Sequence, residues 1–312
     1  MERIVDIGTE GLHLSTHRGF LMVTRDRDEV GRVALDDVHA VILHAHGCTW
    51  TGNLAAALAE RGAPILFCNS HHSPVAVTLP IAGFHAQGGR MRAQWEASRP
   101  LTKQLWQRVV KAKIAMQGAL LAFQGAPEAA AFDLIARRVR SGDPDNLEAQ
   151  AARRYWPALM GPAFRRDRGA DGANALLNYG YAVMRATVAR AVVAAGLHPT
   201  IGIFHAKRGN AFALADDLVE PFRPFVDALV VSLLGQGVET LDPEIKRRFA
   251  QLIAFDVRIG DDMSPISVAA QRLAHSLARS FETKSSDLVL FVPPTHAGWA
   301  GLTRPLATPA DA

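Results

Sequence analysis

Cysteine is scarce in this sequence: Cys48 and Cys68 are the only two among 312 residues, and they do not form a closely spaced pair. This scarcity argues against a disulfide-stapled scaffold and against a cysteine-rich zinc site. No run of about eighteen uninterrupted apolar residues occurs, so the sequence predicts no membrane span. The first residues contain no basic segment followed by a long apolar run, so no signal peptide is expected. We therefore expect a soluble protein of the cytoplasm.

Neither sign of charge dominates the composition. The sequence has 34 lysines and arginines against 30 aspartates and glutamates, a formal net charge of +4. With 49% hydrophobic and 21% charged residues, it has the balance of a folded globular protein. Basic residues nevertheless gather in five clusters, at 103–113, 137–140, 153–154, 165–168 and 246–248. Together they favour a polyanionic partner, although each one alone is more typical of a solvated helix face.

The pattern of apolar residues changes near residue 80. Before it, short apolar or alternating segments predict strands at 3–7, 11–15, 19–24, 38–43 and 64–68. An alanine-rich segment, 54–60, follows Thr51 and precedes Gly62, which predicts one short capped helix. After residue 90, apolar residues recur at three- and four-residue spacing and predict helices at 91–97, 101–123, 173–195, 241–254 and 266–281.

These patterns predict an α+β fold in two domains. We expect a β-rich, β-sandwich-like N-terminal domain at 1–80 and a larger all-α catalytic domain at 93–295. Residues 81–92 are expected to form a linker between them. The proline-containing segment 296–312 is expected to be a loose tail.

Segment 202–224 is the most informative part of the sequence. His205 follows a short apolar stretch, and a helical pattern begins several residues later. On one continuous helix, Asp217 and Glu220 would stand on the same side, where a cation would relieve their repulsion. Two carboxylates with one imidazole suit Mg²⁺ or Mn²⁺, which can stabilise charge on a phosphoryl oxygen. An ordinary acidic first turn is an equally good interpretation, and Pro221 complicates any continuous helix.

Glu148 is the candidate for a third acidic ligand. It stands in the stretch 143–156, whose aspartates and asparagine are typical of a capped helix start. A glutamate used only to stabilise a helix N-terminus is the simpler interpretation. Four histidines, His44, His46, His71 and His72, could suggest a separate metal cluster. They lie among strands and turns without acidic companions, so core or loop histidines are favoured there.

Several stretches resemble a known family. The run 214–224 reads Leu-Ala-Asp-Asp-Leu-Val-Glu-Pro-Phe-Arg-Pro, and the stretch 142–153 contains Glu148. Both resemble the integrase subunit of CRISPR adaptation, the universal spacer-acquisition protein that inserts short DNA pieces into a repeat array. The segment 177–181 with Arg185, and His205 with Asn210, fit the same pattern. The resemblance extends over most of the chain and points to the type II branch, with subtype II-C favoured.

The resemblance implies a set of site residues and partners. It places the family's metal ligands at Glu148, His205 and Glu220, with Asp217 as an assisting acidic residue and Mg²⁺ or Mn²⁺ as the cofactor. It implies a homodimer formed through the N-terminal domain. Two such dimers would flank a dimer of a small ferredoxin-like adaptation partner, giving a heterohexamer. The type II effector nuclease of the same locus would be a further partner.

The function we expect is that of a metal-dependent DNA integrase. A 3′-hydroxyl of a short double-stranded DNA fragment would attack a phosphodiester of CRISPR repeat DNA. Two alternatives stay open: a metal-dependent nuclease without strand transfer, and a non-catalytic DNA-binding scaffold. Sequence does not separate the first two, because hydrolysis and transesterification differ only in the attacking oxygen. The side chains expected to contact DNA are Lys207, Arg208, Arg223, Arg153 and Tyr179.

Overall fold

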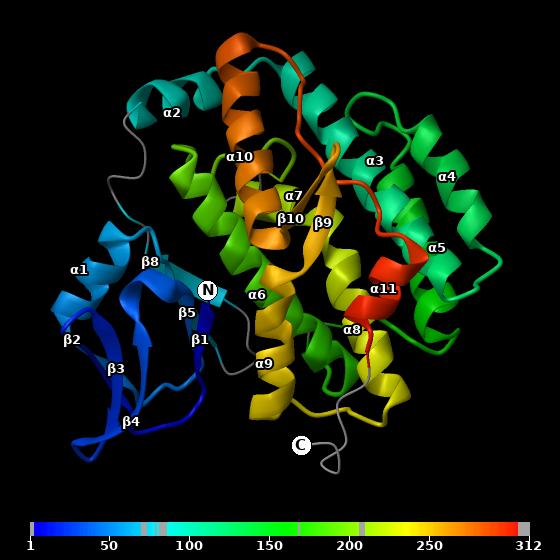
Figure 1. Cartoon of the computed structure of the whole chain (residues 1–312). Coiled ribbons are helices and arrows are strands. Elements are labelled where there is room, and N and C mark those ends of the chain that lie inside the picture. The colour runs from blue at the N-terminus through cyan, green and yellow to red at the C-terminus, as the bar shows by residue number, and fades with distance from the viewer. Residues whose placement is uncertain are drawn as a thin grey trace.

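The computed structural model describes residues 3–69, 74–78, 80, 86–167, 169–205 and 210–304. Figure 1 shows most strands gathered in one lobe and most helices in the other, with α6 near the middle and the β9–β10 hairpin among the helices. The strands are β1 (Arg3–Ile7), β2 (His13–His17), β3 (Phe20–Arg25), β4 (Asp28–Ala34), β5 (Val38–Leu43), β6 (Thr49–Trp50), β7 (Ile65–Cys68), β8 (Pro74–Thr78), β9 (Asp256–Ile259) and β10 (Asp262–Pro265). The α-helices are α1 (Gly52–Glu60), α2 (Gln87–Trp95), α3 (Arg99–Phe123), α4 (Ala129–Arg138), α5 (Leu147–Met160), α6 (Ala173–Ala194), α7 (Ala213–Leu218), α8 (Arg223–Gly235), α9 (Pro243–Gln251), α10 (Ile266–Thr283) and α11 (His296–Leu302). Three 3₁₀ turns are η1 (Leu35–Asp37), η2 (Glu220–Phe222) and η3 (Leu252–Ala254).

The N-terminal lobe contains two four-stranded sheets, ordered β4-β3-β2-β6 and β1-β5-β7-β8. In the second sheet β1, β5 and β7 are parallel, and β8 is antiparallel to β7. Side chains of both sheets share one apolar core with α1, which Thr51 caps by accepting from the backbone N–H of Leu54. A strand-rich N-terminal part followed by a helical part is therefore confirmed.

Strand β5 explains how the two lobes join. All six of its residues are buried, as expected for a parallel strand covered on both faces. Val41 and Leu43 pack into the core of the N-terminal lobe. On the opposite face, Ala40 packs with Ala186 of α6, so the helical lobe covers the other side of the sheet.

The long helices begin and end where the sequence provides stop signals. Ser98 caps α3 by accepting from the N–H of Leu101. Helix α6 lies between Gly172 and Gly196, which have φ angles of 63° and 74° that few other residues adopt readily. Helix α10 packs along α6, as Figure 1 shows. The expected helices at 101–123, 173–195 and 266–281 correspond to α3, α6 and α10, within two residues at each end.

Three expectations about the second half are wrong. It is not all-α, because β9 and β10 form an antiparallel hairpin in which Val257 and Ile259 are buried and their neighbours exposed. The strands have only four residues each, too few to give a clear alternating pattern. The segment after 295 is not wholly loose, since α11 buries Trp299 against the core. Finally, the expected linker 81–92 contains the start of α2 at Gln87, and its residues 81–85 lie outside those described.

Candidate active site

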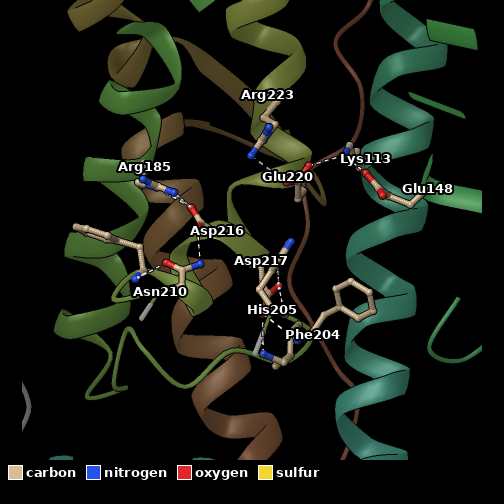
Figure 2. A network of polar contacts seen from close by, with 12 residues as sticks. Lys113, Glu148, Arg185, Phe204, His205, Asn210, Asp216, Asp217, Glu220 and Arg223 are labelled. Carbon is tan, nitrogen blue, oxygen red and sulfur yellow. Dashed lines mark hydrogen bonds and ion pairs between the residues drawn. The ribbon is translucent and has the colours of Figure 1, made fainter. Parts of the chain in front are cut away.

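The acidic segment 213–223 is divided into three short elements rather than one helix. Helix α7 ends at Leu218, η2 begins at Glu220 with Pro221 in its first turn, and α8 begins at Arg223. The expected stacking of Asp217 and Glu220 on one helical face is therefore wrong. Proline disrupts a helix interior because it lacks an N–H and its ring collides with the preceding turn. Figure 2 shows that the acidic side chains of this segment instead point to different partners.

Asp217 is fully buried and holds the loop that carries His205. Its Oδ2 accepts from the backbone N–H groups of Ile203 and Phe204, at 2.7 and 3.0 Å. Its Oδ1 lies 3.1 Å from the backbone N and 2.6 Å from Nδ1 of His205. A Cβ at Gly202 would lie 2.7 Å from Oδ2 of Asp217 and 2.5 Å from the His205 carbonyl oxygen, so this close packing requires glycine.

The contact with Asp217 controls both the orientation and the charge of His205. When Asp217 accepts a hydrogen bond from Nδ1–H of His205, it favours the tautomer in which Nε2 keeps its lone pair. Metal-ligating histidines have this arrangement. The same hydrogen bond raises the pKa of His205, and burial opposes that rise only in part. Trp106 stacks on Phe204 at 4.2 Å and meets the His205 ring edge-on at 5.9 Å, so packing also restrains the imidazole.

Glu220 and Glu148 converge on the ammonium group of Lys113. Lys113, from α3, is 7% exposed; its Nζ contacts Glu148 and lies 2.5 Å from Oε2 of Glu220. The other oxygen of Glu220, Oε1, lies 3.1 Å from Arg223. Burial alone would raise the pKa of Glu220, but Arg223 and Lys113 outweigh it and hold that pKa below its usual value. Burial likewise disfavours the Lys113 ammonium, yet Glu220 and Glu148 raise its pKa.

Asp143 positions Glu148 at the start of α5. The Asp143 carboxylate accepts from the N–H groups of Leu147 and Glu148, both at 2.9 Å, which caps the helix. The Glu148 side chain remains 28% exposed and reaches back to α3. A glutamate that served only the helix end would not need this long-range pairing, so the structure favours the site interpretation.

A further ion pair, between Arg185 and Asp216, lies near the Lys113–Glu220 pair. Arg185 of α6 donates from Nε to Oδ1 of Asp216 at 2.6 Å, and Asn210 donates to Oδ2 of Asp216 at 2.9 Å. The Asn210 side-chain oxygen accepts from the N–H of Phe212. Through Asp216, these contacts connect Asn210 and the start of α7 to Arg185 of α6, as Figure 2 shows.

An open cleft of about 390 Å³ borders these groups. Its lining includes four cationic side chains, Lys113, Arg166, Arg185 and Arg223, together with Trp156 and Tyr181. At its base Asp227, 2% exposed, accepts from the hydroxyls of Tyr155, at 2.7 Å, and Tyr181. Burial raises the pKa of Asp227 to about 6, although the two tyrosine hydrogen bonds oppose the rise.

The remaining predicted residues have mixed outcomes. Arg223 lines the cleft, and Arg153 is exposed on α5. Lys207 and Arg208 lie outside the described residues, as do His71 and His72. The expectation that Tyr179 contacts DNA is wrong for this structure, because its ring is fully buried and its hydroxyl donates to Asp6 at 3.0 Å.

Among the described residues, the histidines of the N-terminal lobe form no metal cluster. His44 lies 3.0 Å from Asp6 at the junction between the lobes, and His46 is exposed. Across the described ranges as a whole, no three His, Cys, Asp or Glu side chains are grouped closely enough to hold a metal ion. In the candidate site, the ammonium of Lys113 contacts both Glu148 and Glu220.

Sequence reasoning missed Lys113 as a site residue and placed it in a basic surface cluster. A signal was present, since Lys113 lies on the buried face of α3 near Val109, Val110 and Ile114. Arg166 and Asp227 were missed as well. Arg166 stands in a loop of charged residues and Asp227 within an apolar helix, so the sequence around them did not mark either as a residue of the cleft.

The fold and site define a protein with a strand-rich lobe and a helical lobe, the latter presenting carboxylates, an oriented imidazole and a cationic cleft. No helix among the described residues is long and apolar enough to cross a membrane. The sequence matches the profile of the family described as CRISPR associated protein Cas1 over residues 6–246. The chain therefore belongs to the Cas1 family.

Relatives and structural neighbours agree with this assignment. A curated protein named CRISPR-associated endonuclease Cas1, from Neisseria meningitidis, is 40% identical over 253 residues, which are 80% of this chain and 82% of that protein. A casposase bound to integration product has a similar fold, with a TM-score of 0.77 at 21% identity and 92% of both chains covered. A Cas6-RT-Cas1–Cas2 complex gives a TM-score of 0.75 at 17% identity, covering 94% of this chain and 36% of that one.

Proposed function

We propose that this protein is a metal-dependent DNA integrase of CRISPR adaptation, in the type II branch and with subtype II-C favoured. The observation that carries the proposal is the convergence of Glu148 and Glu220 on one cationic group, beside an imidazole that Asp217 orients. Membership of the Cas1 family and the fold shared with a casposase bound to integration product support it.

The donor set fits Mg²⁺ or Mn²⁺ chemically. Glu148, His205 and Glu220 would hold the ion, and they offer the carboxylate oxygens and imidazole that such ions accept. Oε2 of Glu220 is buried and lies 2.5 Å from the ammonium of Lys113, which also contacts Glu148. A divalent ion that took the place of this ammonium would gain the oxygen as a ligand. When bound, such an ion would polarise the scissile phosphate and offset the charge that develops on it.

The protein's own residues would bind and align the DNA. The cationic side chains of the cleft, including Arg223 and Arg185, would face the phosphate backbone and make affinity sensitive to salt. Arg153, Lys207 and Arg208 are proposed to extend this contact. Asp217 would keep the His205 ring in place, and the packing of Trp106 and Phe204 would limit its movement. Positioning of this kind supplies much of the catalysis in phosphoryl transfer.

The assembly is also a proposal. We infer a homodimer that binds a small ferredoxin-like partner dimer as a heterohexamer, with the effector nuclease of the locus as a further partner. The fold shared with a chain of a Cas6-RT-Cas1–Cas2 complex supports a Cas2-type partner. A protein that acts on the CRISPR repeat DNA of its own cell would be located in the cytoplasm, and we propose this location.

The test is joining of a labelled DNA fragment to a repeat-containing plasmid, compared between wild type and Glu220→Gln. We expect joining to fall by roughly 100-fold or more in the variant, because a site group that stabilises the transition state is lost. Glutamine is preferred to alanine because Lys113 and Arg223 would otherwise lose their buried partner.

Glu244→Gln is the matched control. Glu244 also pairs with an arginine three positions later, Arg247, at 3.0 Å, but its side chain is 59% exposed and distant in sequence from the site. This variant should join DNA normally. Equal joining by wild type and Glu220→Gln would refute the proposed site.

A further inference from the structure

We propose that Lys113 is a positioning residue that holds Glu148 and Glu220 in place until a divalent cation replaces its ammonium group. This inference rests on the proposed metal-dependent function and deepens it. Lys113 Nζ contacts Glu148 Oε1 and Glu220 Oε2, the two carboxylate oxygens that a cation between these residues would also need. An ammonium group and a metal ion cannot occupy that position together, so they compete for it.

The contacts of Glu220 divide between its two oxygens in a way that permits this exchange. Oε1 is held by Arg223 at 3.1 Å, whereas Oε2 lies 2.5 Å from the ammonium of Lys113. Loss of the Lys113 contact would therefore leave Arg223 in place and Glu220 still paired. The carboxylate would remain oriented while one of its oxygens changes partner.

Gln117 provides an acceptor for the displaced ammonium. It stands one helical turn after Lys113 on α3, 4% exposed, and both residues line the cleft. In the described part of the chain, Oε1 of Gln117 is buried and has no hydrogen-bond partner. Buried polar atoms are rarely left in this state. A lysine side chain has a flexible four-carbon stem, so the ammonium of Lys113 can turn from the two glutamates toward Gln117 and stay at the cleft.

A half-buried lysine, Lys246, shows what a purely structural ion pair looks like. Lys246 donates to Asp6 at 3.0 Å, and the same carboxylate also accepts from Tyr179 and contacts His44. Every oxygen there has a directed partner independent of any ion. The Lys113 cluster differs because a buried acceptor, Gln117 Oε1, stands one helical turn away and has no hydrogen-bond partner among the described residues.

The experiment measures Mn²⁺ binding to the full-length protein, without DNA, by calorimetric titration. Lys113→Met keeps an unbranched four-atom stem and removes the ammonium group with its charge. We expect this variant to bind Mn²⁺ more tightly than wild type, on the order of tenfold, a usual size for coupling between competing ligands. In EDTA it should melt at a lower temperature than wild type, and Mn²⁺ should raise its Tm by more. Lys246→Met, the matched control, should bind Mn²⁺ like wild type.

The outcomes separate this inference from the proposed function. Unchanged or weaker Mn²⁺ binding by a folded Lys113→Met protein, with wild type binding normally, would overturn the exchange alone. Failure of both proteins to bind Mn²⁺ would overturn the metal-dependent function and the exchange with it. If Lys113→Met does not fold, Lys113→Gln, which keeps a donor without the charge, is measured in its place and must show the same tighter binding.

Discussion

Oδ1 of Asp217 lies 2.6 Å from Nδ1 of His205, and the same carboxylate accepts hydrogen bonds from three consecutive backbone N–H groups at 203–205. One buried side chain thus fixes both the loop and the ring that it carries. Asp217 thus positions the imidazole, and the proposed metal ion would bind Nε2, the ring nitrogen that does not contact this carboxylate.

Replacing Asp217 with Asn should lower DNA joining by roughly 10- to 100-fold, the usual loss when the partner of a metal-ligating histidine is altered. The amide is nearly the same size, but it is a weaker acceptor for Nδ1 and the three backbone donors. The rate of joining and the affinity for Mn²⁺ should fall together. Asp133→Asn, at an exposed position on α4, should change neither quantity.

The pH dependence of joining should reflect the raised pKa of His205. A protonated imidazole cannot bind a metal ion, so activity should be lost as the pH falls through that pKa. Because the Asp217 hydrogen bond raises the pKa, its weakening in Asp217→Asn should move the acid limb to lower pH. The measurement is a pH–rate profile of both proteins; an acid limb that stays in place or moves upward would contradict this assignment.

Asp227 should make the protein less stable as the pH rises from about 4 to about 6. Burial raises the pKa of Asp227 from 3.8 to about 6, so the folded state favours the protonated carboxyl. The stability that this preference contributes is complete below the unfolded-state pKa and disappears as the pH rises through the folded-state pKa. A shift of this size corresponds to about 3 kcal/mol at most. Urea unfolding of wild type and Asp227→Asn across this range should show the decline in wild type only.

Tyr179→Phe tests the junction between the lobes. The Tyr179 hydroxyl donates to Asp6, which also contacts His44 and Lys246, so residues from β1, α6 and α9 meet there with His44, just after β5. Removing the hydroxyl should lower the free energy of unfolding by roughly 1 to 3 kcal/mol, because one hydrogen bond to a charged group is lost. Thermal melting measures the loss. Since Tyr179 is buried, the affinity for DNA should not change, and a selective loss of DNA binding would restore the role first expected from sequence.

Sequence reasoning selected the residues of the candidate site because they lie in locally informative segments. Glu148 follows capping residues, and Glu220 and His205 stand in a run with a distinctive order. Pro221 signalled the break between α7 and η2, but a proline does not predict which partners the neighbouring side chains contact. Asp217 contacts His205, whereas Glu220 contacts Lys113 and Arg223.

Long-range pairing could not be predicted in the same way. Lys113 meets Glu148 and Glu220 only when α3, α5 and η2 pack together, and no local pattern encodes that packing. Tyr179 and Tyr181 illustrate a related difficulty. They stand two positions apart on α6 and therefore on nearly opposite sides of the helix, so one faces Asp6 and the other Asp227. Sequence identified the helix but not which side faces the cleft.

Strand transfer itself is tested most directly by the end of the incoming DNA. Two labelled fragments, identical except that one ends in a 3′-hydroxyl and the other in a 3′-deoxy sugar, are incubated with the wild-type protein, Mn²⁺ and a repeat-containing plasmid. We expect label to join the plasmid only from the hydroxyl-ended fragment, and EDTA to abolish joining. Plasmid cutting that is the same with both fragments, with no label joined from either, would contradict it and identify a nuclease instead.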